Sequence, residues 1–216
     1  MKFGAVLFDL DGTLLDTIGL WTQAYLQTLQ DAGLEISTEE FILTTYIQNK
    51  HFKEVLVHYG LDAKHAEEFR ATRDARYTQL LATEPLWIDG AEETLRKITR
   101  SYPTGIMTGS HLHYIEAIEQ QIPLRSLVPV VVTCDEVRGR GKPHPDGLLL
   151  TARKLGIPPE QCLYVGDQLF DIEAAAAADM TSCLYWNEYT PPTAGQEADM
   201  SIESLSDLPS LLGLCR

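Results

Sequence analysis

Short apolar runs recur along the chain and alternate with stretches of helical periodicity. The first run, Ala5–Phe8, stops at a cluster of acidic residues and glycine, as expected of a buried strand that delivers Asp9 to the edge of a sheet. Four later runs have the same character: Thr104–Thr108, Leu127–Thr133, Cys162–Val165 and Thr181–Tyr185. The alternation predicts parallel βαβ units and a doubly wound, Rossmann-like α/β core, whose ligands bind beyond the carboxyl ends of the strands.

Residues that start and stop helices mark the segments between these strands. Asp89 is predicted to cap a helix over residues 91–100, and the alanine-rich residues 168–178 predict another helix. Residues 187–198 lack such a pattern, so we expect a loop there.

Residues 16–86 break the alternation because they contain long amphipathic stretches and no strand pattern. Ser37–Glu40 has the sequence of a capping box, and Asp62 is placed to cap a long helix. An insertion of this kind must bury its own apolar faces, so we expect a small all-helical cap domain over residues 16–86. The catalytic core then comprises residues 1–15 and 87–216. Its two connections to the cap would act as hinges that open and close over the sheet edge.

Composition narrows the classes of partner and compartment. The 216 residues include 17 Lys and Arg against 31 Asp and Glu, a formal charge of −14, which repels polyanions and argues against a nucleic-acid partner. The apolar run that begins at Gly4 stops at Asp9, too early for a signal peptide or a membrane span, so we expect a cytoplasmic protein with no membrane partner. The four cysteines form no CxxC pair and are interpreted as reduced structural thiols. The oligomeric state stays open.

Two carboxylates, Asp9 and Asp11, follow the first buried strand in the segment Phe-Asp-Leu-Asp-Gly-Thr. Like charges this close repel each other, so a divalent cation, a shared proton or a lysine must offset the cost. The alternative is a simple turn at Asp11–Gly12 without chemical function. Other chemically active residues at the same edge of the sheet would favour the functional explanation over the simple turn.

Further polar residues follow the other predicted strands. They are Thr108 and Gly109, Lys142 in the loop Gly141–Pro145, and Asp167 with Asp171. In a parallel sheet these residues converge on one edge, which then holds a nucleophilic carboxylate, a second acid, a cation and hydroxyl or N–H donors. This combination favours phosphoryl transfer assisted by a hard cation such as Mg²⁺.

The motifs also carry a family resemblance. Residues 8–17 (FDLDGTLLDT) and 141–146 (GKPHPD) resemble the haloacid dehalogenase superfamily of phosphohydrolases, in the branch with a helical cap after the first strand. The chain is similar to phosphoglycolate phosphatase-like and β-phosphoglucomutase-like members from Phe3 to about Tyr185, although the cap matches only in architecture. The resemblance implies a Mg²⁺-dependent phosphoric monoester hydrolase that acts on a small phosphorylated metabolite through an aspartyl-phosphate intermediate.

The resemblance also implies roles for individual residues. Asp9 matches the nucleophile and a Mg²⁺ ligand, Asp11 matches the general acid/base with its backbone carbonyl on the metal, and Asp167 matches the later metal ligand. Thr108 and the Gly109 N–H match the donors to the phosphoryl oxygens. Lys142 matches the cation that steadies nucleophile and phosphate, and Asp171 matches the outer acid that holds metal waters or the lysine.

Departures from the family pattern are informative. Gln168 stands where relatives usually carry Ser or Thr, and Asp179 stands where glycine commonly ends a helix; we expect neither to touch the chemistry. Trp21 stands where β-phosphoglucomutase-like relatives usually have a histidine, which favours a phosphatase over a sugar phosphate mutase. Four residues are weak candidates for substrate selection, with packing or solvent exposure as the alternative: Trp21, Gln48, Asn49 and Lys50.

Two rival functions stay open at this point. A sugar phosphate mutase requires the phosphoenzyme to survive water long enough to rephosphorylate a sugar. A phosphate-binding or signalling protein without turnover also groups acids, a threonine and a lysine at a sheet edge, although the retained Asp9 and Asp11 give no sign of lost turnover.

Overall fold

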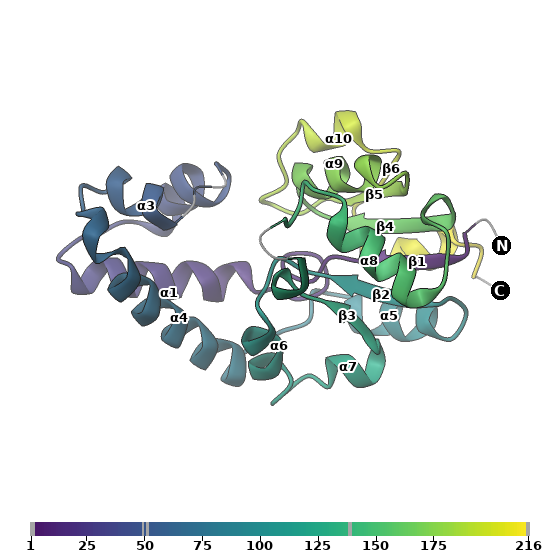
Figure 1. The fold of residues 1–216 in the computed structure, drawn as a ribbon, viewed down its shortest axis with the longest axis horizontal. Coiled ribbons are helices and arrows are strands. Elements are labelled where there is room, and N and C mark those ends of the chain that lie inside the picture. The colour runs from purple at the N-terminus through teal and green to yellow at the C-terminus, as the bar shows by residue number, and fades with distance from the viewer. Residues whose placement is uncertain (1–2, 49, 51, 138–139, 215–216) are drawn as a thin grey trace. The chain divides into compact units, whose positions relative to one another are not determined.

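The chain forms two compact units in a computed structural model that describes residues 3–48, 50, 52–137 and 140–214 (Figure 1). Thr17–Glu84 forms one unit, and the residues before and after this segment form the other. The division lies one residue after the start and two residues before the end of the predicted insertion, residues 16–86.

The larger unit is built on one six-stranded parallel sheet (Figure 1). The strands are β1 (Ala5–Phe8), β2 (Thr104–Met107), β3 (Val130–Val132), β4 (Cys162–Gly166), β5 (Thr181–Tyr185) and β6 (Met200–Ile202). Their order is β3-β2-β1-β4-β5-β6, with every neighbouring pair parallel. The first strand therefore lies inside the sheet and the chain extends from it in both directions, which confirms the predicted doubly wound α/β core.

The sequence of β1 follows from burial on both faces. All four of its residues are buried, and Ala5 and Leu7 share one apolar cluster with the helices α8 (Asp146–Leu155) and α9 (Leu169–Ala177). Side chains alternate between the faces of a strand, so the residues between them face the other side. A strand that is covered on both faces has no polar position, which explains the continuous apolar run.

The remaining helices of this unit are α5 (Ala91–Thr99), α6 (Leu112–Ile118), α7 (Leu124–Leu127), α10 (Ala194–Glu197) and α11 (Leu208–Leu211). Helix α5 packs against α7 and α11. The predicted N-cap at Asp89 is wrong. Gly90 occupies that position with a φ of 72°, and a Cβ there would lie 2.4 Å from the Ser206 hydroxyl oxygen. The tight left-handed turn takes the place of a side-chain cap.

The C-terminal part of the sheet also differs from the prediction. Residues 187–198 are not a loop throughout, because α10 lies within them, and β6 follows as a sixth strand. Both elements are very short, and β6 lies at the sheet edge with only Ile202 buried. Three residues are too few to show the periodicity by which a strand is identified.

The smaller unit is helical throughout, as predicted. Its elements are α1 (Ile18–Asp31), α2 (Thr38–Phe41), a π-helical turn (Ile42–Tyr46), α3 (Phe52–His58), a 3₁₀ turn (Ala63–His65) and α4 (Ala66–Thr83). The Ser37 hydroxyl accepts a hydrogen bond from the Glu40 N–H at 3.1 Å, and Asp62 accepts one from the Lys64 N–H at 2.9 Å. Both predicted caps therefore start helical segments.

The two connections between the units run beside each other within the larger unit. The Asp16 N–H donates to the Leu86 carbonyl at 2.9 Å, and the Ile88 N–H donates to the Leu14 carbonyl at 3.0 Å. These two hydrogen bonds join the segment that follows β1 to the segment by which the chain returns from the helical insertion. Among the residues that the structure describes, no helix is both long and apolar enough to cross a membrane.

Candidate active site

Asp9 is the first residue after β1 and lies at the carboxyl edge of the sheet. Its backbone N–H still donates to the Val165 carbonyl of β4 at 2.8 Å, and its side chain is only 5% exposed. Its carboxylate forms an ion pair with the Lys142 ammonium at 2.7 Å. Burial raises the pKa of Asp9 well above its usual value. Lys142 lowers this pKa, but the repulsion of the Asp171 and Asp167 carboxylates adds to the effect of burial and outweighs it.

Lys142 bridges Asp9 to a second buried carboxylate. Its ammonium lies 2.5 Å from Asp171 Oδ1 and donates to the Tyr164 hydroxyl at 3.1 Å. Burial disfavours the charge, but the neighbouring carboxylates Asp171 and Asp9 outweigh it, so the pKa of Lys142 lies above its usual value. The lysine is therefore a permanent cation in this cluster.

Asp171 is already fully engaged by protein groups. Oδ1 accepts from Lys142 and, at 3.1 Å, from the Tyr164 hydroxyl. Oδ2 accepts from the backbone N–H groups of Asp167 at 3.2 Å and Gln168 at 3.0 Å, as part of the capping box that starts α9. The carboxylate thus orients the lysine and the chain after β4.

Asp167 is completely buried directly after β4. Oδ1 accepts from the Thr13 hydroxyl at 2.8 Å, and Oδ2 accepts from the side-chain amides of Gln168 at 2.7 Å and Asn187 at 3.0 Å. Burial, with Asp171 adding to it, raises the pKa of Asp167 to about 6, although these hydrogen bonds oppose the rise. The expectation that Gln168 stays away from the chemistry is wrong, because its amide contacts a candidate metal ligand.

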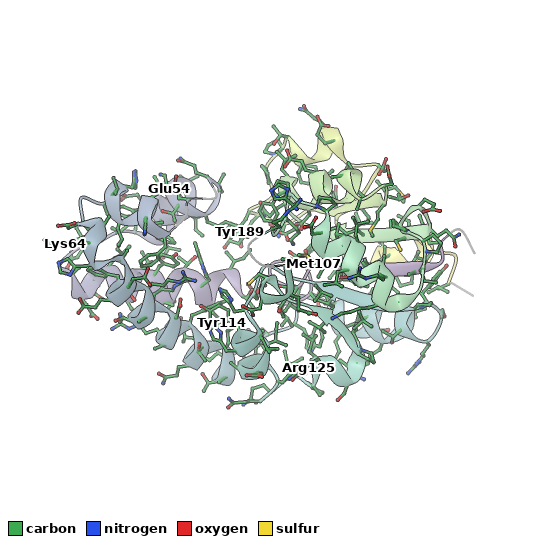
Figure 2. All side chains as sticks on the ribbon, viewed as in Figure 1. Glu54, Lys64, Met107, Tyr114, Arg125 and Tyr189 are labelled. Carbon is green, nitrogen blue, oxygen red and sulfur yellow. The ribbon has the colours of Figure 1, made fainter. Side chains whose placement is uncertain are left out.

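The half-buried Asp11 lies on the β2 side of the cluster. Its Oδ2 accepts from the Thr108 hydroxyl and from the Ser110 hydroxyl, both at 2.8 Å. Thr108 follows Met107, the last residue of β2, which Figure 2 labels, and its N–H donates to the Val132 carbonyl of β3 at 3.0 Å. The exposed Gly109 is next in the chain. Two strand ends thus place an acid beside a hydroxyl-lined turn.

The buried carboxylates fit a hard divalent cation. Asp9, Asp167 and Asp171 are all buried, and each offers a carboxylate oxygen within 4.8 Å of the others. Lys142 pairs with Asp9 and Asp171, while Asp167 is held by neutral donors, so the three carboxylates give this buried cluster excess negative charge. Asp171 is held by Lys142 and by two backbone N–H groups, whereas the donors to Asp167 are neutral side chains that can rearrange around an ion, so Asp9 and Asp167 are the better carboxylates to hold a cation. Hard oxygen donors of this kind suit Mg²⁺.

The predicted substrate-selection residues belong to the helical unit. Trp21 packs in an aromatic cluster, with ring centroids 4.5 Å from Tyr25 and 5.6 Å from Phe41. Gln48 donates to the Leu43 carbonyl at 3.1 Å, and Lys50 donates to the Thr44 carbonyl. Asn49 lies outside the described residues. The contacts of Trp21, Gln48 and Lys50 stabilise the helical unit itself, and their part in selection stays a prediction.

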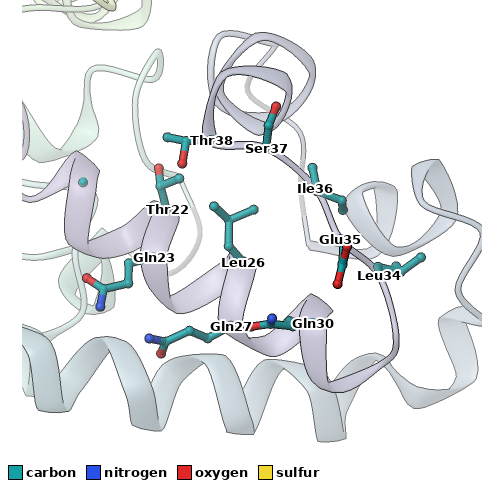
Figure 3. Close-up of a pocket in the computed structure, with 11 residues that line it drawn as sticks. Thr22, Gln23, Leu26, Gln27, Gln30, Leu34, Glu35, Ile36, Ser37 and Thr38 are labelled. Atoms are coloured by element: carbon teal, nitrogen blue, oxygen red, sulfur yellow. The ribbon is translucent and has the colours of Figure 1, made fainter.

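A pocket of about 480 Å³ also lies within the helical unit (Figure 3). It is lined by α1 residues such as Thr22, Gln23 and Gln27, and by the segment Leu34–Thr38. None of the predicted catalytic or phosphate-binding residues lines it.

The structure brings further residues into the cluster that the sequence analysis did not single out. Thr13 follows Asp11 by two residues, and Ser110 follows Thr108 by two residues. The position of a polar residue just after a strand end could therefore have indicated that both belong to the site. Tyr164 lies inside the buried strand β4. The only signal in the sequence was that a buried tyrosine hydroxyl needs a hydrogen-bond partner, which here is Lys142 or Asp171. Asn187 had no sequence signal, because it reaches Asp167 from 20 residues further along the chain and also donates to the Gly12 carbonyl at 3.0 Å.

Comparison with known proteins identifies the family. Residues 3–179 match the model of the haloacid dehalogenase-like hydrolases. A phosphoglycolate phosphatase of Xanthomonas campestris is 33% identical over 82% of this chain and 80% of its own length, and one from Escherichia coli K12 is 29% identical over 97% and 92%. The crystal structure of CbbY from Rhodobacter sphaeroides in complex with phosphate is 26% identical with a TM-score of 0.81, covering 98% of this chain and 99% of CbbY.

These matches cover the sheet, the motif residues and the helical insertion. They confirm the expected phosphoglycolate phosphatase-like resemblance, which the motifs after β1 and around Lys142 indicated. The chain belongs to the haloacid dehalogenase-like hydrolase family and is a phosphoric monoester hydrolase of that type.

Proposed function

We propose that this enzyme is a Mg²⁺-dependent phosphatase that hydrolyses a small phosphate monoester through an aspartyl-phosphate intermediate on Asp9. The observation that carries the proposal is the ion pair of the buried Asp9 with Lys142 at 2.7 Å, beside the buried Asp167. A carboxylate held in this way is fixed in position, and the neighbouring cation favours the ionised form that a nucleophile requires against the effects of burial and the other carboxylates.

In the first half-reaction, an Asp9 carboxylate oxygen attacks phosphorus and the bond between phosphorus and the substrate oxygen breaks. Asp11 gives its proton to the leaving oxygen, so the alcohol departs neutral. The Thr108 hydroxyl, which contacts Asp11 in this structure, turns to a phosphoryl oxygen, and the N–H of the next residue, Gly109, donates to the phosphoryl group as well. Lys142 offsets the charge of the phosphoryl oxygens. The product of this half-reaction is phosphorylated Asp9.

In the second half-reaction, Asp11 takes a proton from water as the water oxygen attacks phosphorus. The bond between phosphorus and the Asp9 oxygen breaks, which releases phosphate and restores the carboxylate. The Ser110 hydroxyl orients Asp11 for both transfers, since it donates to Asp11 Oδ2 independently of Thr108.

Asp9 and Asp167, with the backbone carbonyl of Asp11, are the proposed metal ligands, and Asp171 positions Lys142. When bound, Mg²⁺ supplies positive charge that offsets the charge of the transferring phosphoryl group. Thr13, Gln168 and Asn187 hold the Asp167 carboxylate in place.

The relatives direct the choice of substrate. The Xanthomonas campestris and Escherichia coli proteins are named phosphoglycolate phosphatases, so phosphoglycolate is the first candidate. Sugar phosphates are the second class, because a variant of CbbY that is 26% identical to this chain was crystallised with xylulose-(1,5)bisphosphate. The cytoplasmic location and the absence of nucleic-acid and membrane partners stay predictions.

The test is phosphate release from a panel of small phosphate monoesters, with Mg²⁺ and with EDTA, for the wild type, Asp9→Asn and Asp11→Asn. Asp179→Asn is the matched control, because Asp179 is exposed and asparagine tolerates its left-handed backbone. We expect Mg²⁺-dependent turnover that both site variants lose and the control keeps. Folded wild type that releases no phosphate from any monoester would refute the proposal, and a stable phosphoenzyme that transfers to a sugar would favour the mutase.

A further inference from the structure

A second group of potential metal ligands lies outside the carboxylate cluster. His111 Nδ1, Cys134 Sγ and an Asp135 carboxylate oxygen all lie within 4.8 Å of one another. His111 follows β2 by four residues, and the other two lie just beyond β3, so neighbouring strand ends bring them together. The distances are 2.8 Å from His111 Nδ1 to Asp135 Oδ1 and 3.2 Å from His111 Nδ1 to Cys134 Sγ.

The backbone holds these ligands in place. Asp135 Oδ2 accepts from the Leu112 N–H at 2.7 Å at the start of α6, which leaves Oδ1 turned toward His111. The Cys134 N–H donates to the Ser110 carbonyl at 3.2 Å, so the two loops are joined. A site with two of its three ligands anchored in this way loses little conformational freedom when a cation binds.

The donor atoms differ in kind from those of the active site. One thiolate, one imidazole nitrogen and one carboxylate suit a borderline cation such as Zn²⁺, whereas the all-carboxylate cluster suits Mg²⁺. The negative charges of the thiolate and carboxylate match the two positive charges of the ion.

The distances require only a small adjustment. In a tetrahedral zinc site with Zn–N and Zn–O bonds of about 2.1 Å and a Zn–S bond of about 2.3 Å, neighbouring ligand atoms lie roughly 3.4 to 3.6 Å apart. The two separations from His111 Nδ1, 2.8 Å and 3.2 Å, are about half an ångström shorter, as expected of hydrogen-bonded groups, and the Cys134 and Asp135 ligand atoms lie within 4.8 Å of each other. The side chains of His111 and Asp135 are 35% and 46% exposed, so an ion can enter from solvent and water can complete the coordination.

We propose that His111, Cys134 and Asp135 form a second cation site that binds Zn²⁺ on the rim of the active-site turn. Binding releases the thiol proton of Cys134 and replaces the hydrogen bonds at His111 Nδ1 with metal bonds. Because Ser110 precedes His111 and its hydroxyl donates to Asp11, the ion fixes the turn that orients the general acid/base.

Zinc binding is tested by titrating the protein with Zn²⁺ in saturating Mg²⁺, which occupies the carboxylate cluster, and by following Co²⁺ binding through its thiolate-to-metal absorption. The parent protein and every variant carry Cys215→Ser, so that this cysteine cannot bind the metal or the alkylating reagent. Cys162 and Cys183 are buried, which leaves Cys134 as the thiol that the experiment follows. The variants are Cys134→Ala and His111→Asn, with His113→Asn as the matched control. His113 stacks on His111 with a centroid distance of 5.5 Å but does not belong to the ligand group.

We expect one Zn²⁺ per chain, a thiolate absorption band with Co²⁺, and protection of Cys134 from alkylation by Zn²⁺. Cys134→Ala and His111→Asn should each weaken binding at least about 100-fold, because removing even an outer partner of a ligand costs about 10- to 100-fold. His113→Asn should bind as the parent does. Absence of the thiolate band, or equal Zn²⁺ affinity in parent and Cys134→Ala, would overturn the proposal, and circular dichroism of each variant establishes that it is folded. These readouts need no turnover, so they are independent of the phosphatase proposal.

Discussion

Replacing Asp9 with asparagine is expected to stabilise the metal-free protein while abolishing turnover. Asp9 is buried with Asp167 and Asp171, and both Asp9 and Asp171 pair with the Lys142 ammonium. Removing the Asp9 charge leaves Lys142 paired with Asp171 at 2.5 Å, so the lysine stays compensated. The variant therefore loses a repulsive charge that the proposed mechanism requires, an arrangement common in active sites.

The magnitude follows from the separations. With an effective dielectric constant of about 20, two carboxylates no more than 4.8 Å apart repel by at least about 3.5 kcal/mol, so Asp9 meets about 7 kcal/mol from its two acidic neighbours. Its attraction to Lys142 at 2.7 Å is about 6 kcal/mol on the same scale. The cost of burying the charge adds to the repulsion, so Asp9→Asn should raise the free energy of unfolding by about 1 to 2 kcal/mol.

The assay is thermal and urea unfolding of wild type and Asp9→Asn in EDTA, with Asp179→Asn as the exposed matched control. An increase of about 1 kcal/mol corresponds to a rise in Tm of about 2 to 4 °C for a protein of this size. Mg²⁺ should stabilise the wild type more than Asp9→Asn, because the variant has lost a ligand charge. Asp9→Asn that is less stable than wild type in EDTA would refute the reasoning.

The same cluster sets the sign of a pH dependence in EDTA. The pKa of Asp167 is raised to about 6 in the folded protein, and that of Asp9 is also raised, so the native state binds more protons than the unfolded state at mildly acidic pH. Stability therefore falls as the pH rises from about 4 through 6, by up to about 3 kcal/mol for Asp167 alone. Asp167→Asn should flatten this part of the profile in urea unfolding, and an equally steep profile would contradict the assignment.

Three further predictions concern single side chains. Tyr164→Phe removes a hydroxyl that contacts Asp171 and should cost about 1 to 2 kcal/mol in urea unfolding; unchanged stability would argue against a working hydrogen bond. Gly166→Ala places a Cβ 2.5 Å from Asp171 Cγ and should lower kcat at least about tenfold, whereas Gly19→Ala, whose Cβ meets nothing within 4 Å, should leave kcat unchanged. Burial raises the pKa of Cys183 to about 12, so peptide mapping should find it unmodified by iodoacetamide at pH 8 in the native protein and modified after denaturation; modification of native protein would show that the strand opens.

The sequence alone determined the core of the fold and the order of the chemistry along it. Ala5–Phe8 is apolar at every position because both faces of the strand are covered, and that pattern is visible within a few residues. The acids at positions 9 and 11, the Thr108 turn and the Lys142 loop follow strand ends, and parallel strands bring their ends to one edge. Local pattern and topology together were enough to predict this grouping.

Only the tertiary structure decided which partners hold these groups. Thr13 and Asn187 meet on Asp167 from opposite ends of the chain, and His111 meets Cys134 through the pairing of β2 with β3. The need for a residue without a Cβ at position 90 likewise comes in part from Ser206, whose hydroxyl oxygen would lie 2.4 Å from that Cβ. Hydrophobic periodicity reports whether a residue faces the core, because burial repeats with the geometry of the element. It carries no information on which two polar atoms meet, because that depends on packing between segments that are distant in sequence.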